Sequence, residues 1–121
     1  MAKSSVTADV ILTFELEGAQ PEAQAFIFDS FDDTSAVDRF NAGAVRVTMW
    51  VEPASNEPRT YEHDGMKCHR FTVSMSMTFA IEGGYADAQA WVLDRLQPKN
   101  GVHNMVVQSV NLLCTPLIDG H

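Results

Sequence analysis

The feature that most constrains the fold of this chain is an internal repeat. After a shift of 65 residues, segment 13–31 aligns with segment 78–96, and five pairs exchange one apolar residue for another. Repetition at a fixed spacing predicts that one structural unit is formed twice. The identical pairs are Thr13/Thr78, Phe14/Phe79, Glu17/Glu82, Gly18/Gly83, Ala23/Ala88, Gln24/Gln89, Ala25/Ala90 and Asp29/Asp94.

Each copy changes its hydrophobic period at the shared glycine. Before Gly18 and Gly83, apolar and polar residues alternate, which predicts strands that bury one face. After the glycines, apolar residues recur at helical spacing, and Pro21 suits the first turn of a helix. We expect two further strands over residues 44–52 and 105–114.

These elements predict an α+β fold with the order β-α-β-β-α-β. The expected architecture is a two-layer ferredoxin-like sandwich formed by internal duplication. Its four-stranded antiparallel sheet has the order 4-1-3-2, with two helices on one face. One domain covers residues 1–121, with half-repeats at about 5–52 and 67–115 joined by a loop at 53–66. A helical turn over 34–40 is expected in the connection between residues 32 and 43.

Charge and composition narrow the classes of partner. The chain has 16 acidic and 8 basic residues, a formal charge of −8. This acidity argues against direct nucleic-acid binding, which needs a basic surface for phosphates, and is compatible with basic protein partners. No apolar run has the length of a membrane span or a signal-peptide core, so we expect a cytoplasmic protein that does not bind membranes.

The sheet face away from the helices is expected to be rich in hydroxyl groups and mildly apolar. Such a face is solvated, packed against another sheet in a homodimer or larger assembly, or used as a surface for a ligand or nucleic acid. Its central strands offer no aromatic residue on which a nucleic-acid base could stack. The expected members are Ile11, Thr13 and Glu15; Arg46, Thr48, Trp50 and Glu52; Cys68, Arg70, Thr72, Ser74, Ser76 and Thr78; and Val107, Ser109, Asn111 and Leu113.

An edge of this face carries the best local cluster. If facing positions of the second and third strands sum to 120, Trp50 and Arg70 are cross-strand neighbours, and both residue types are enriched in binding hot spots. We therefore predict a partner-binding surface of Arg46, Thr48, Trp50, Glu52, Arg59, Arg70 and Thr72. A separate acidic patch is predicted at Asp29, Asp32, Asp33 and Asp38.

The sequence offers little for catalysis or metal binding. His63, Asp64, Cys68 and His69 are close together, but their spacing matches no established zinc pattern. Two cysteines are too few for a disulfide framework, and we expect both to be reduced. No catalytic residue, metal site or cofactor is predicted.

The favoured hypothesis is a non-catalytic interaction protein. It would self-associate as a homodimer or dock on a protein partner, as an inhibitor or adaptor, through the open face and the edge between the second and third strands. The alternative is a small-molecule-binding or enzymatic domain of the dimeric α+β barrel type. Its ligand would contact His69, His103 and the methionines of the third strand.

Overall fold

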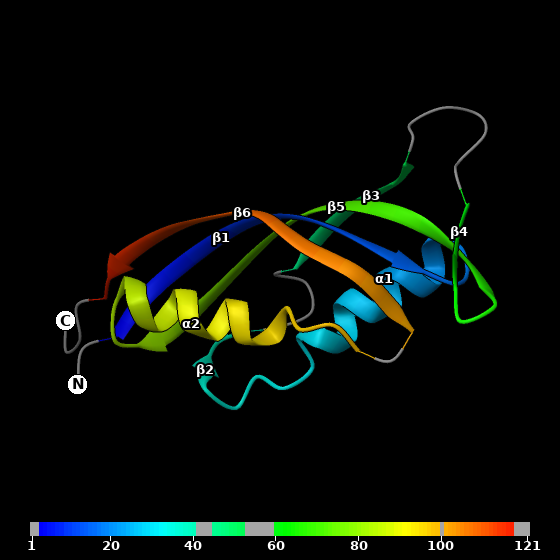
Figure 1. Cartoon of the computed structure of the whole chain (residues 1–121). Helices are drawn as coiled ribbons and strands as arrows, with labels where there is room; N and C mark the ends of the chain where they lie inside the picture. The colour runs from blue at the N-terminus through cyan, green and yellow to red at the C-terminus, as the bar shows by residue number, and fades with distance from the viewer. Residues whose placement is uncertain (1–2, 41–44, 53–59, 100, 118–121) are drawn as a thin grey trace.

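The computed structural model describes residues 3–40, 45–52, 60–99 and 101–117, and of Glu52 it describes the backbone alone. Two helices lie on one side of an arched antiparallel sheet (Figure 1). In chain order the elements are β1 (Lys3–Leu16), α1 (Gln20–Ser30), β2 (Val37–Asp38), β3 (Arg46–Glu52), β4 (Thr60–His63), β5 (Met66–Glu82), α2 (Tyr85–Arg95) and β6 (Val102–Pro116).

Strands β1 and β5 form the centre of the sheet. Lys3 pairs with Glu82 at one end of β1 and Leu16 pairs with His69 at the other. The other edge of β1 pairs with β6. The second edge of β5 is divided among three strands, since β2, β3 and β4 pair with successive parts of it.

The expected four-stranded ferredoxin-like sandwich is wrong, because the sheet has six strands. The reason is the length of β5. Its 17 residues extend for about 55 Å, whereas the 7 residues of β3 reach only about 23 Å. The rest of this edge pairs with β2 and β4. Strand β2 occupies part of the segment where a helical turn was expected, and β4 lies inside the expected 53–66 loop.

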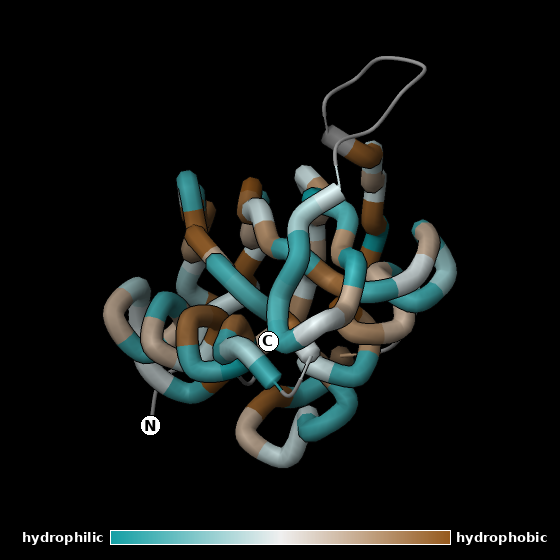
Figure 2. Tube along the Cα trace, turned by 45° about the vertical axis from the view of Figure 1, so that its right-hand side comes forward, coloured by the Kyte–Doolittle hydropathy of each residue, from teal (hydrophilic) through white to brown (hydrophobic). Residues whose placement is uncertain are grey.

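The core lies between the sheet and the helices. Alternate residues of β1, from Val6 to Phe14, are fully buried there, and the odd-numbered residues 71–79 of β5 join them. The alternation of hydrophobic and hydrophilic residues along the strands is visible in Figure 2. Trp91 of α2 contacts the rings of Phe31 and Phe79, at 5.8 and 4.7 Å between centroids.

The two helices begin in the same way, 65 residues apart. Gly18 and Gly83 adopt φ angles of +120° and +108°, which residues with a Cβ rarely adopt. The carboxylates of Glu22 and Asp87 each accept a hydrogen bond of 3.0 Å from the backbone N–H three residues earlier. Among the residues described, neither helix is long and apolar enough to cross a membrane.

Candidate functional site

The face of the sheet opposite the helices has short polar side chains in its middle and larger side chains towards its edges. Strand register places these residues in four cross-strand rows. The rows are Trp50–Thr72–Thr13–Val106, Thr48–Ser74–Ile11–Ser109, Arg46–Ser76–Asp9–Asn111 and Thr78–Thr7–Leu113.

Four large apolar side chains in these rows are exposed. Ile11 is 38% exposed, Trp50 40%, Val106 54% and Leu113 68%. Trp50 lies on β3, Ile11 on the central strand β1, and the other two on β6. Exposed apolar side chains gathered on one face are typical of interaction sites.

The open face is close to electrically neutral. Its four rows contain one cation, Arg46, and one anion, Asp9, which lie in the same row with Ser76 between them. The chain as a whole carries a charge of −8. The acidic residues are therefore concentrated elsewhere on the molecule.

Bulges in β6 change which of its residues reach the open face. The register shifts between Ile11 and Leu12, so Val107 pairs with Leu12 and packs against the core. Val106 is exposed in the place where Val107 was expected. The sequence could not show this, because a shift of one residue reverses which face a side chain occupies.

The predicted pairing of Trp50 with Arg70 is also wrong. Facing positions of β3 and β5 sum to 122, so Trp50 lies opposite Thr72, and Glu52 lies opposite Arg70. Arg46, Thr48, Trp50 and Thr72 do share the open face. Arg59 lies outside the described residues.

Arg70 instead belongs to a polar cluster around Glu15, which was expected to be a solvated residue at a strand end. The Glu15 side chain is only 1% exposed. Its carboxylate forms an ion pair with Arg70 Nη2 at 3.1 Å, accepts a hydrogen bond from Asn104 Nδ2 at 3.0 Å, and also contacts His63 Nε2. These four residues come from β1, β4, β5 and β6, so the cluster joins four strands.

The surroundings of Glu15 favour its charged form. Burial alone would raise the pKa of this carboxyl. The hydrogen bonds from His63 and Asn104, together with the charges of Arg70 and His63, outweigh burial and hold the pKa below its ordinary value. The backbone of Asn104 has φ +51° at a register shift of β6, which directs its amide towards the carboxylate. The carboxylate of Glu15 is thus stabilised by the charges and hydrogen bonds around it.

The same end of the sheet also contains stacked rings and the thiol of Cys68. His63 stacks on His103 with 4.3 Å between ring centroids, and the Arg70 guanidinium lies 5.2 Å from the centre of the Tyr61 ring. Burial and then the charges of Glu17 and Glu15 raise the pKa of the Cys68 thiol, so it stays protonated. No group of three His, Cys, Asp or Glu residues within the described segments is arranged to hold a metal ion.

The four residues of the predicted acidic patch fall into two groups, two whose carboxylates have partners and two that line a groove. Asp38 forms an ion pair with Lys3 at 2.6 Å, and the pKa of Asp38 is lowered by that hydrogen bond and charge. Asp33 accepts a hydrogen bond from the Ser35 backbone N–H at 3.1 Å. Asp29 and Asp32 line a groove beside α1.

The residues expected to contact a small ligand are not brought together. Met75 and Met77 are packed into the core, at 2% and 0% exposed. His69 lies beside the loop before α1, where Nδ1 is 3.2 Å from the Gly18 carbonyl oxygen. His103 stacks on His63, on the opposite face of the sheet from the methionines.

Comparison with known proteins gives this chain no relative. No protein-family model matches it, and neither does any curated protein or solved structure.

Proposed function

We propose that this chain is a non-catalytic interaction protein that self-associates through the open face of its sheet. The observation that carries the proposal is the set of four exposed apolar side chains, Ile11, Trp50, Val106 and Leu113, on a face whose other residues are mostly short and polar. Burying such side chains is favourable by about 25 cal/mol per Å². Short threonine and serine side chains between them allow two sheets to approach closely.

The arrangement of the face suits a two-fold symmetric dimer. A two-fold axis parallel to the strands, midway between β1 and β5, exchanges the β3 side of the face with the β6 side. Trp50 of one copy then lies opposite Val106 of the other, and Thr72 lies opposite Thr13. The large side chain at each edge of one copy thus lies opposite the large side chain at the other edge of the second copy. The same surface is used by both copies, as an isologous interface requires.

Charge also favours a second copy over a basic partner at this face. Arg46 and Asp9 leave the four rows without net charge. The rest of this acidic chain would attract a basic surface, but the open face would not. Repulsion between two chains of charge −8 is screened over about 8 Å at physiological salt.

Sedimentation velocity of the full chain tests the proposal. The wild type is expected to sediment with twice the mass of one chain. Ile11→Glu would place an unpaired charge in the dry centre of the interface in both copies, and should raise the dimer dissociation constant by about a hundredfold or more.

Leu93→Glu is the matched control. Leu93 of α2 has the same exposed fraction as Ile11, 38%, but lies in the helix layer. This variant should remain dimeric. A monomeric wild type, or an equal loss of dimer in both variants, would refute self-association through the open face.

A further inference from the structure

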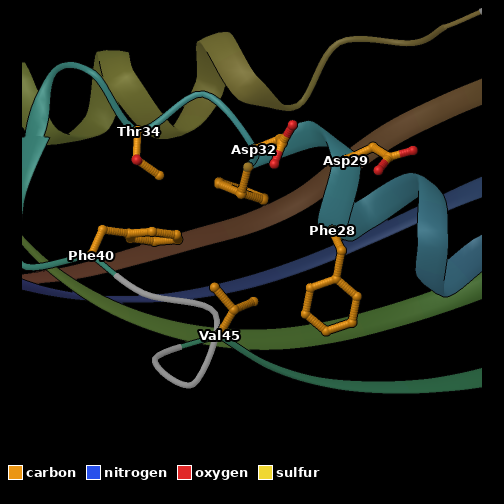
Figure 3. A pocket seen from close by; sticks show the side chains of 7 residues that line it. Phe28, Asp29, Asp32, Thr34, Phe40 and Val45 are labelled. Atoms are coloured by element: carbon orange, nitrogen blue, oxygen red, sulfur yellow. The ribbon is translucent and has the colours of Figure 1, made fainter.

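A groove lies in the helix layer, on the side of the molecule away from the open face. Its volume is about 360 Å³, within the range of ligand-binding pockets. Four apolar side chains line it, Phe28, Phe31, Phe40 and Val45. Phe28, Phe40 and Val45 surround a common space beside the end of α1 (Figure 3).

The apolar lining is held in place by the core. Phe31 and Val45 are 3% and 7% exposed, and the Phe40 ring packs on Trp91 at 5.7 Å and on Phe79 at 6.3 Å. Phe28, by contrast, is 38% exposed on the groove wall. The groove is therefore formed without any need to rearrange the core.

Two carboxylates, Asp29 and Asp32, stand on the α1 side of the groove (Figure 3). Neither carboxylate has a hydrogen bond or ion pair with any residue in the described part of the chain. The repeat supplies an internal comparison, because Asp94 of α2 corresponds to Asp29. Asp94 has an ion pair of 3.5 Å with Arg95, whereas the position after Asp29 is Ser30.

The described residues that line the groove all come from the first half of the chain. There α1 and β3 are joined by residues 31–45, which include Phe40 and the strand β2. In the second half, α2 and β6 are joined by residues 96–101 only. The longer connection thus adds an aromatic wall beside two carboxylates that pair with no cation among the residues the structure describes.

We propose that this groove docks a basic segment of a protein partner, one that presents an arginine or lysine next to an apolar side chain. The apolar side chain would fill the space between Phe28, Phe40 and Val45. The cationic group would pair with Asp29 and Asp32 and lie against the exposed ring of Phe28, since cations are attracted to aromatic faces. This surface is separate from the open face, so the docking does not depend on self-association.

The test uses a capped, fluorescein-labelled peptide with an Arg–Leu pair between serine and glycine residues, and the same peptide with glutamine in place of arginine. Fluorescence anisotropy measures binding of each to the full-length chain. The arginine peptide should bind at least about tenfold more tightly than the glutamine peptide. Asp29→Asn/Asp32→Asn should remove that preference, and Phe28→Ser should weaken both peptides.

Asp64→Asn/Asp94→Asn is the matched control, because it removes the same charge away from the groove, and asparagine suits the φ of +51° at Asp64. The control should keep the preference for arginine. The proposal is overturned if the arginine peptide binds the wild type more weakly than about 1 mM, if glutamine serves as well, or if both double variants lose equal affinity.

Discussion

The buried carboxylate of Glu15 is the residue whose chemistry most depends on the fold. A carboxylate with 1% exposure is stable only if its charge is balanced, and His63, Arg70 and Asn104 provide that balance. Because the three partners come from β4, β5 and β6, Glu15 also fixes the positions of those strands relative to β1.

Replacing this carboxylate should show how much Glu15 contributes to stability and how that contribution depends on pH. At neutral pH, Glu15→Gln should lower the free energy of unfolding by about 1–3 kcal/mol, since charge-assisted hydrogen bonds are lost. The folded pKa lies below the ordinary value, so the unfolded chain takes up the proton first as the pH falls. The stabilisation by Glu15 is complete at pH values above the pKa of this residue in the unfolded chain. It is lost as the pH falls through the pKa of Glu15 in the folded chain.

Urea denaturation at neutral and acidic pH measures this effect, as the difference between wild type and variant. That difference should shrink as acid protonates Glu15. Glu82→Gln, at an exposed position of β5, should change stability by less than about 0.5 kcal/mol at either pH. A constant difference between wild type and Glu15→Gln across the acid range would show that Glu15 does not titrate as described.

The element that distinguishes this fold from the expected one is the hairpin of β4 and β5. Its turn is Asp64–Gly65, and both residues have positive φ, +51° and +79°. Two residues of this kind match the right-handed twist of antiparallel strands, and an Asp-Gly pair between strands is a strong hairpin signal. That signal is present in the sequence, but segment 53–66 is a long polar connection rich in Pro, Asn, Glu and Gly, which favoured a loop.

Gly65 provides a test of the turn. A Cβ at this position would meet nothing within 4 Å, so any loss of stability reflects backbone strain alone. Gly65→Ala should lower the free energy of unfolding by about 1–2 kcal/mol, and Gly65→Asn by less, since asparagine tolerates this conformation. Chemical denaturation distinguishes the two. Equal stability of Gly65→Ala and the wild type would contradict the turn.

Local patterns predicted the helices and the buried strand faces, because helix starts and alternation depend on neighbours in sequence. The helix starts at Gly18 and Gly83 are of this kind. The pairing of Trp50 with Arg70 and the exposure of Val107 were wrong because register depends on bulges and turns elsewhere in the chain. The Glu15 cluster joins residues up to 89 positions apart, so no local pattern could predict it.

The whole molecule presents two unlike surfaces on its two layers. The open face is neutral and carries exposed apolar side chains, whereas the groove beside α1 is apolar with two carboxylates that have no cation among the described residues. If both proposals hold, a dimer formed through the sheets displays two acidic grooves on its outer sides. Such an assembly could bind two basic segments at once and gain avidity from doing so.

The most direct test of self-association is an isotope-filtered NOE experiment on an equal mixture of labelled and unlabelled chains. Within one chain, Trp50 and Val106 are three strands apart across the sheet, about 14 Å, which is too far for an NOE. The two-fold dimer places the indole ring of Trp50 against the methyl groups of Val106 in the other copy. We predict an intermolecular NOE between them, and its absence would contradict the proposed dimer.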